Sequence, residues 1–166
     1  MPEALDFVVF TVLIGAGATA FLDLSALAQT WLLGTPLPDY GPVGRWLGHM
    51  AHGQVRHEAI AASPPVHGER PLGWAAHYLT GIAFAAVLVA GGGLDWVRQP
   101  TLGPALIVGL GSAAVPFLIM QPGMGFGIAA RLTPDPWARR RRTLIAHGAF
   151  AIGLYVAGVG ASVLVR

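Results

Sequence analysis

Four long apolar runs constrain this chain more than any other feature of its sequence. They cover residues 7–33, 72–91, 101–120 and 143–165. A helix needs about 20 mostly apolar residues to cross a bilayer. Only 11% of the chain is charged, whereas a soluble domain averages about a quarter. The sequence therefore predicts an all-α, polytopic membrane protein. We expect a single integral membrane domain over residues 1–166, built as a compact bundle of four transmembrane helices.

The first run is expected to be a retained membrane helix. The tripeptide at 18–20, ATA, imitates a signal-peptidase site, but Glu3 and Asp6 stand where a signal peptide carries basic residues. The apolar run also continues beyond that site. Small residues recur in all four runs, as GAGATA at 15–20, Gly81 with Ala85, GLGSAA at 109–114 and GVGA at 158–161. Because small residues allow close backbone contact between helices in lipid, we expect tight packing without a water-filled pore.

The arginines, which supply all the fixed positive charge, are distributed unequally between the loops. The first and third loops hold Arg45, Arg56, Arg70, Arg131, Arg139, Arg140, Arg141 and Arg142, and the opposite side holds Arg98 and Arg166. Since short cytoplasmic loops are enriched in arginine, we expect these two loops in the cytoplasm and both termini outside. We expect Arg139, Arg140, Arg141 and Arg142 to contact anionic lipid headgroups. A net charge of +2 does not indicate nucleic acid.

Polar residues inside the apolar runs gather in the half that adjoins these two loops. His77 and His147 lie roughly 9 and 7 Å into their runs, and Gln121 closes the third run. Asp23 lies near the bilayer middle, where an unpaired charge costs about 2.5 to 3.5 kcal/mol. We expect Asp23, His77 and His147 to line one cavity. The alternatives are a protonated Asp23 that only joins helices, and histidines that are ordinary interfacial residues.

The segment GRWLGHMAHGQVRH concentrates basic side chains in the first loop, namely Arg45, His49, His52, Arg56 and His57. Residues 43–53 predict a short amphipathic helix on the membrane surface, with Trp46 at the interface and Arg45 reaching a phosphate. His49 and His52, three residues apart, would share one face of that helix. Two histidines do not complete a metal site, and no zinc motif is present. Plain interfacial residues are therefore the alternative interpretation.

Prolines and glycines occur at residues 64–71, just before the second run, and at residues 116–127, at the end of the third run. Pro64, Pro65 and Pro71 are expected to exclude helix up to the second run. The third run ends in MQPGMGFG at 120–127, where Pro116 and Pro122 predict a kinked helix that unwinds at the cytoplasmic boundary. Irregular backbone at membrane depth needs protein or a polar cavity to satisfy it, so we expect this stretch to line the same pocket. Plain termination of the helix is the alternative.

Between Gly15 and His147 the chain contains the blocks GAGATAFLDLSAL, VGRWLGH, HEAIAASPPVHGERPLGWAAHYLTGIAFA, RQPTLGPALIVGL and PFLIMQPGMGFGIAA. In combination these blocks resemble an uncharacterised family of small bacterial inner-membrane proteins, a domain of unknown function. The resemblance implies four transmembrane helices and a bacterial inner membrane. It implies no activity, so it assigns no catalytic residue.

Three functions are compatible with the sequence, and whether the chain is an enzyme is left open. The first is a cytoplasmic-half pocket, possessing or lacking catalytic activity, for a metal, a haem or a small polar or lipid-like ligand. Its candidate residues are Asp23, Arg45, His49, His57, Arg70, His77, Gln121 and His147, with Arg45 and Arg70 as an anion clamp and His49, His77 and His147 as candidate metal ligands. The second is a proton-coupled carrier that uses Asp23 and His77. The third is a non-catalytic subunit of a homo-oligomer or a larger membrane complex.

Overall fold

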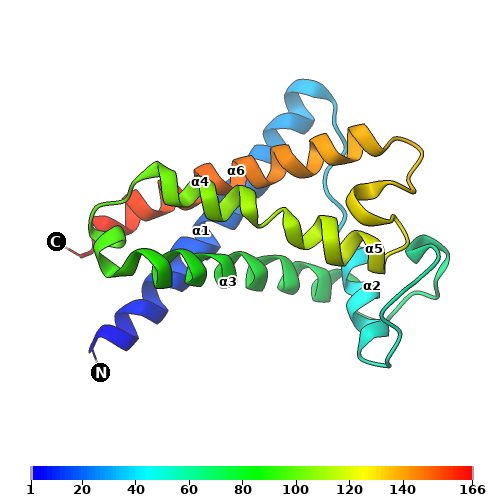
Figure 1. Ribbon diagram of the computed structural model, residues 1–166, viewed down its shortest axis with the longest axis horizontal. Coiled ribbons are helices and arrows are strands. Elements are labelled where there is room, and N and C mark those ends of the chain that lie inside the picture. Colours follow the sequence, from blue (N-terminus) through cyan, green and yellow to red (C-terminus); the bar gives the residue numbers. More distant parts are fainter. Residues whose placement is uncertain (1, 166) are drawn as a thin grey trace. The chain divides into compact units, whose positions relative to one another are not determined.

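The computed structural model describes residues 2–165, which form helices and loops without strands (Figure 1). The elements are α1 (Pro2–Leu33), α2 (Gly41–Met50), η1 (Ile60–Ala62), α3 (Glu69–Arg98), α4 (Leu102–Gly111), η2 (Pro116–Met120), α5 (Gln121–Gly123), η3 (Ile128–Ala130) and α6 (Pro136–Ser162). Arg166, which entered the topology argument, lies outside the described residues. The all-α prediction is confirmed.

Within the described residues, four helical segments are long and apolar enough to cross a membrane. They are Glu3–Leu33, Glu69–Arg98, Leu102–Gly123 and Pro136–Ser162. The four predicted spans are therefore confirmed by length and composition, although the helices extend further toward the loops. Helix α6 begins before the arginine run because Asp135 Oδ1 accepts a hydrogen bond from the Ala138 N–H at 2.9 Å. A carboxylate in this position caps a helix N-terminus, and Pro136 suits the first helical turn.

Pro71 corrects one sequence prediction, because it lies inside α3 and does not exclude helix. It occupies the first turn, where its missing N–H would have had no intrahelical acceptor, so the ring removes no helical hydrogen bond. Glu69 Oε2 accepts a hydrogen bond from the Val66 N–H at 3.0 Å and so helps to begin the helix. Pro64 and Pro65 lie outside helix, as predicted.

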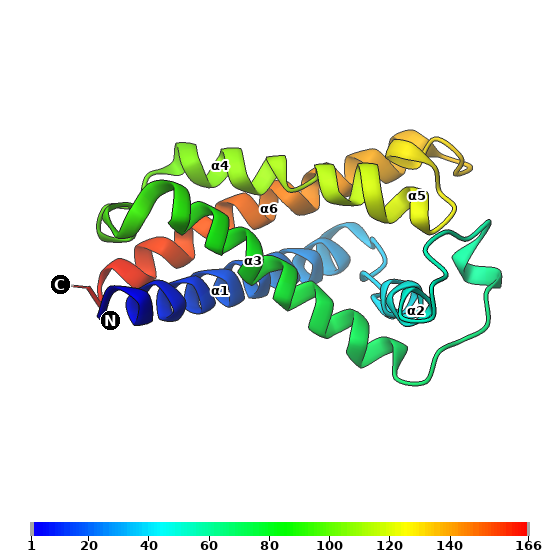
Figure 2. The same ribbon diagram turned by 60° about the horizontal axis from the view of Figure 1, so that its bottom comes forward.

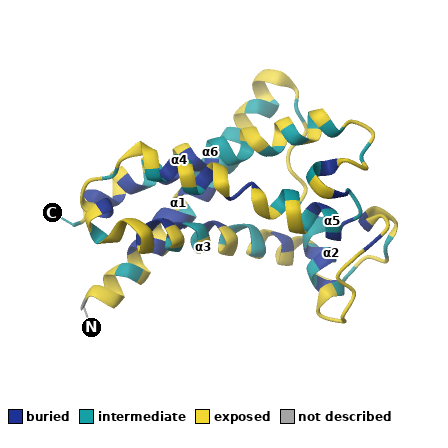
Figure 3. Cartoon of the chain, viewed as in Figure 1, coloured by how far each residue is buried: buried dark blue, intermediate teal, exposed yellow. Residues whose placement is uncertain are grey.

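The described chain divides into two compact units, which are treated separately below. The span unit consists of the chain up to Leu37, Tyr78–Ser112 and the chain from Ala146, and the loop unit consists of Pro38–His77 and Ala113–Ile145. In the span unit, parts of α1, α3, α4 and α6 lie alongside one another (Figures 1 and 2). Their shared core includes Ile14, Val89 and Leu154, and much of the outer surface is exposed (Figure 3).

Small residues hold the helices of the span unit close together, as the sequence predicted. A Cβ added at Gly15 would overlap the backbone of Ile82, and one added at Gly109 would overlap Ala151. Ala18 and Ala85 are fully buried in the same core. Because dispersion contacts between backbones replace a hydrophobic drive in lipid, these positions favour association of the helices.

The third span is broken, which confirms the predicted kink. Helix α4 ends at Gly111, and a π-helical turn, η2, begins at Pro116. Proline has no N–H to donate and its ring clashes with the preceding turn, so a regular α-helix cannot continue through it. Single π turns inside helices are frequent at functional sites. The broken segment carries the chain from the span unit into the loop unit.

In the loop unit, α2 overlaps the short helix predicted over residues 43–53 but begins two residues earlier and ends at Met50, and its Trp46 is buried instead of lying at an interface. Trp46 is 7% exposed and packs with Ile60 and Met124 in a small core. Its indole N–H donates a hydrogen bond to the Val55 carbonyl at 2.8 Å. The ring therefore joins α2 to the following loop, because burial inside the unit satisfies both its apolar body and its single donor.

Candidate functional site

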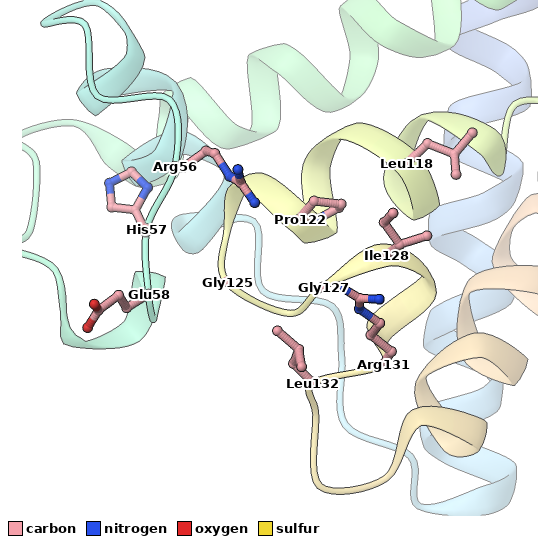
Figure 4. A pocket seen from close by; sticks show the side chains of 10 residues that line it. All are labelled: Arg56, His57, Glu58, Leu118, Pro122, Gly125, Gly127, Ile128, Arg131 and Leu132. Carbon is pink, nitrogen blue, oxygen red and sulfur yellow. The ribbon is translucent and has the colours of Figure 1, made fainter.

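A hollow in the loop unit is the candidate site (Figure 4). Its volume is about 280 Å³, and it is lined by Arg56, His57, Glu58, Leu118, Pro122, Gly125, Gly127, Ile128, Arg131 and Leu132. One wall is the loop that follows α2, and the other walls come from η2, α5, η3 and the turns around them. The hollow therefore brings together residues that are far apart in the sequence.

The side chains of the hollow combine two cations with an apolar surface. Figure 4 shows Arg56 reaching from its loop toward Pro122, whereas the side chains of His57 and Glu58 lie on the other side of that loop. Arg131 supplies the second guanidinium, and Leu118, Ile128 and Leu132 supply apolar walls. A guanidinium binds phosphate or carboxylate oxygens through a fixed fork of donors. This composition suits a ligand with an anionic group next to an apolar part.

The turn beneath the hollow contains strained backbone. Ala129 and Ala130 have φ of 47° and 60°, in the left-handed region that L residues with a Cβ rarely adopt. Two side chains hold this turn: Arg140 Nε donates to the Ala129 carbonyl at 2.7 Å, and the Thr133 hydroxyl donates to the Ala130 carbonyl at 2.7 Å. Strained residues of this kind cluster at binding sites, where surrounding contacts enforce them.

Replacing Ala129 with glycine is expected to stabilise the protein by about 1 kcal/mol, because glycine adopts a positive φ without the Cβ clash that costs L residues about 1–2 kcal/mol. Thermal unfolding of the purified chain in detergent measures the change. The matched control is Ala138→Gly in the regular helix α6, where glycine is expected to destabilise by up to about 1 kcal/mol. Destabilisation by both substitutions would show that Ala129 is not strained.

The loop that forms one wall of the hollow is bonded to the glycine-rich segment that forms another. The His57 N–H donates to the Gly123 carbonyl at 2.9 Å, and the Ile60 N–H donates to the Met124 carbonyl at 3.1 Å. Gly125, with φ of 90°, lies against the carbonyls of His57 and Glu58. The backbone of residues 57–60 therefore adds directly to the shape of the hollow.

Arg45 anchors the same loop from α2. Its Nε and Nη2 donate to the two carboxylate oxygens of Glu69, both at 2.8 Å, in a forked ion pair. Its Nη1 donates to the carbonyls of Ile60 and Ser63 at 3.3 and 3.2 Å. The hydrogen bond from Arg45 to Glu69 raises the pKa of the guanidinium. Because its donors are used within the chain, Arg45 is a positioning residue here, which differs from the anion clamp expected from the sequence. Its expected partner in that clamp, Arg70, is exposed in the first turn of α3.

The structure joins His49 and His57, two of the predicted site residues. His49 Nδ1 and His57 Nε2 lie 2.9 Å apart, and His49 Nε2 lies 3.0 Å from the Pro64 carbonyl oxygen. His57 is 7% exposed, and its Nδ1 has no hydrogen-bond partner in the described chain. His52, which was expected to share a face with His49, donates from Nδ1 to the Gly48 carbonyl at 3.0 Å.

The remaining predicted site residues each have a different hydrogen-bond partner. Asp23 Oδ2 accepts from the Tyr78 hydroxyl at 3.1 Å, and His77 Nε2 lies 3.1 Å from the Tyr40 hydroxyl, on which its ring also stacks. His147 Nδ1 lies 2.7 Å from the Ser112 hydroxyl, which itself donates to Gly109. Gln121 Nε2 reaches the Thr143 hydroxyl at 3.4 Å, and within the described residues its buried Oε1 has no hydrogen-bond partner. The expectation that Asp23, His77 and His147 share one cavity stays a prediction.

Metal ligands are not grouped in the part of the chain that the structure describes. Within residues 2–165, no three His, Cys, Asp or Glu side chains lie close enough together to hold a metal ion. His49, His77 and His147 instead hydrogen bond to His57, Tyr40 and Ser112. We therefore do not assign these histidines as metal ligands.

Sequence reasoning named His57 and the 120–127 stretch, which contribute to the lining of the hollow, but it missed Arg56, Arg131 and the apolar residues around them as site residues. Arg56 and Arg131 entered it only as charges that set the membrane orientation, and the turn at 127–130 was not recognised. One signal was available: the glycine-rich MQPGMGFG segment is followed within a few residues by Arg131. The pairing of that segment with residues 57–60 depends on contacts between distant parts of the chain. Local patterns do not carry this information.

Comparisons with known proteins bear on the family of this chain. No curated protein and no solved structure gives a significant match. Residues 12–161, most of the chain, match a family of proteins whose function is unknown. This match confirms the sequence prediction of an uncharacterised family. The chain belongs to the family described as Protein of unknown function (DUF2938).

Proposed function

We propose that this protein is a membrane-embedded binding protein for an anionic amphiphile, a molecule with a phosphate or similar anion joined to an apolar chain. The observation that carries the proposal is the lining of the hollow, where Arg56 and Arg131 adjoin Leu118, Ile128 and Leu132. The arginines would bind the anionic group and the apolar side chains would contact the adjoining methylene groups. Of the ligands considered from the sequence, which were a metal, a haem and a small polar or lipid-like molecule, the proposal keeps only the lipid-like molecule.

The origin of the apolar wall supports a lipid over a soluble anion. Leu118 and Pro122 belong to the candidate membrane span Leu102–Gly123, so one wall of the hollow is continuous with a segment that suits hydrocarbon. Leu118, Ile128 and Leu132 are exposed to 60%, 50% and 67%. Exposed apolar side chains beside paired cations match the two chemically different ends of a phospholipid.

The strained turn supports a binding role for the same hollow. Ala129 and Ala130 keep left-handed conformations that cost of order 1–3 kcal/mol each, and Arg140 and Thr133 hold them in place. Ile128, Arg131 and Leu132 flank these alanines and line the hollow. A backbone that is held in one costly conformation presents these side chains in fixed positions, which reduces the entropy lost on binding.

We also propose that the loop unit faces the cytoplasm at a bacterial inner membrane. The arginine-rich first and third loops contribute most of its residues, and arginine-rich short loops are retained on the cytoplasmic side. The bacterial membrane follows from the family resemblance. In this orientation the hollow would meet the inner leaflet, whose anionic lipids attract arginine.

The direct test measures binding of phosphatidylglycerol to the full chain in detergent by native mass spectrometry. Arg56→Gln combined with Arg131→Gln is expected to weaken binding by about tenfold or more, because two charge-assisted contacts are lost. The charge-matched control is Arg141→Gln combined with Arg142→Gln, which removes two exposed arginines that do not line the hollow. That control is expected to change binding by less than about threefold.

Two further ligands separate the possible sources of the anion. Phosphatidylcholine, which carries a balancing cation, is expected to bind more weakly than phosphatidylglycerol. Inorganic phosphate is expected to compete only poorly, because it makes no apolar contacts. Stronger binding of inorganic phosphate than of lipid would mean that the ligand is a soluble anion and not an amphiphile. A larger loss in the Arg141 and Arg142 variant than in the hollow variant would overturn the site and favour the arginine run of α6 as the lipid contact.

A further inference from the structure

We infer that the hollow binds its anion together with a proton, and that the hydrogen-bonded pair His49–His57 holds this proton. The inference rests on the proposed function, because it concerns the same hollow and the same anionic ligand. It adds a coupling to pH that neither the sequence motifs nor the family match assigns. Three observations carry it: the fixed tautomers of the pair, the unpartnered Nδ1 of His57, and the position of the His57 backbone in the wall of the hollow.

The hydrogen bonds determine which nitrogen of each ring carries a proton. A carbonyl oxygen can only accept, so His49 Nε2 carries the hydrogen that it donates to Pro64 at 3.0 Å. In a neutral ring His49 Nδ1 is then an acceptor, so His57 Nε2 donates to it at 2.9 Å. His57 Nδ1 is left as a lone pair without a donor among residues 2–165, in a side chain that is 7% exposed. The neutral pair therefore has one vacant proton site.

A single added proton fits this arrangement without breaking a hydrogen bond. It occupies His57 Nδ1, and the bonds from His57 to His49 and from His49 to Pro64 keep their directions. A second proton would place one N–H against another across the 2.9 Å contact and force the rings apart. The pair can thus take up one proton while the hydrogen bonds between His57, His49 and Pro64 stay in place.

The charged groups around the pair come from few elements. On its own loop His57 is flanked by Arg56 and Glu58, and α2 contributes His49. The 64–66 segment contributes the Pro64 carbonyl, and residues 121–127, which pack against the loop, contain no titratable side chain. An anion in the hollow would add a negative charge next to the loop whose backbone forms the wall.

The coupling follows from this proximity. An anion held by Arg56 and Arg131 beside the loop that carries His57 would favour a positive charge on that histidine. Coupling between two sites is reciprocal, so protonation must increase the affinity for the anion by the same factor. His49 lines a second, more open hollow of about 380 Å³ with His52, Gln54, Pro65 and Val66.

The test follows phosphatidylglycerol binding between about pH 8 and about pH 5.5, where histidines change charge but the lipid phosphodiester does not. The affinity of the full chain in detergent is expected to increase at least about fivefold as the pH falls. His57→Gln is expected to lose this increase, since a glutamine amide can donate to His49 but cannot take up a proton. His52→Gln is the matched control, because the His52 side chain bonds to the Gly48 carbonyl and not to His57, and it is expected to keep the increase.

A second measurement uses the unmodified chain, so it does not depend on folding of the variant. Calorimetry of binding in two buffers of different ionisation enthalpy is expected to show uptake of a fraction of one proton per bound lipid near neutral pH. Binding that persists without proton uptake and without pH dependence would overturn the inference and leave the proposed function intact. Binding that is insensitive to the Arg56 and Arg131 substitutions at every pH would instead overturn the proposed function. A pH dependence that disappears in His52→Gln and survives in His57→Gln would also overturn the inference.

Discussion

Replacing Gly44 with alanine is expected to destabilise the protein by about 3 kcal/mol, which would unfold much of the loop unit. A Cβ at Gly44 would overlap the Glu69 carbonyl and lie 2.7 Å from the Gly73 nitrogen. Both are backbone atoms at the start of α3, so they cannot move away as a side-chain tip could. Gly73 lies equally close to the Tyr40 carbonyl, so α2 and α3 interlock through two glycines. Thermal unfolding in detergent, followed by circular dichroism, measures the loss.

The matched control for this prediction is Gly103→Ala in α4, where a Cβ would meet no atom within 4 Å. Alanine is favoured over glycine in a helix by up to about 1 kcal/mol, so the control is expected to be neutral or stabilising. An unchanged midpoint for Gly44→Ala would show that α2 does not pack against the start of α3.

The second large effect is expected at Gly125, where alanine should cost about 3 kcal/mol and abolish lipid binding in the hollow. Two causes add at this position. Its φ of 90° is strained for any residue with a Cβ, and that Cβ would overlap the Glu58 carbonyl. Since His57, Glu58 and Gly125 all line the hollow, pushing their backbones apart would change its shape. Unfolding and phosphatidylglycerol binding are measured on the same preparation.

Gly53→Ala separates the two causes. Gly53 has φ of 83°, but a Cβ there would meet nothing within 4 Å. Its substitution is expected to cost only about 1–2 kcal/mol, the cost of the left-handed conformation, and to leave lipid binding unchanged. Equal losses for Gly53→Ala and Gly125→Ala would mean that the contact with Glu58 does not shape the site.

Other functions compatible with the sequence are not decided by the described contacts. A carrier that uses Asp23 and His77 requires these residues to exchange protons, yet Asp23 accepts a hydrogen bond from Tyr78 and His77 stacks on Tyr40. These contacts are also consistent with residues that join helices. The carrier and the subunit of a larger complex stay predictions that the contacts neither favour nor contradict.

The sequence by itself determined the class of the protein and the position of its spans. Runs of apolar residues of bilayer length permit only a helix in lipid, because the backbone must satisfy its own hydrogen bonds there. The small residues at 15 and 109 were recognised for the same reason, since close helix contact has a local compositional requirement. Helix ends were less accurate: Pro71 is tolerated in a first turn, and Asp135 begins α6 before the arginines.

Only the tertiary structure decided which polar residues form a site, because that choice depends on partners distant in sequence. Arg45 and Arg56 look alike as charges in one loop. In the structure, however, Arg45 forms an ion pair with Glu69, whereas Arg56 lines the hollow. His49 was expected to act with His52 on one helix face, but the return of the loop brings His57 to it instead. The sequence does not indicate the strain at Ala129, because alanine is not a residue type that favours a positive φ. It arises because contacts from Arg140 and its neighbours outweigh a local preference of about 1–2 kcal/mol.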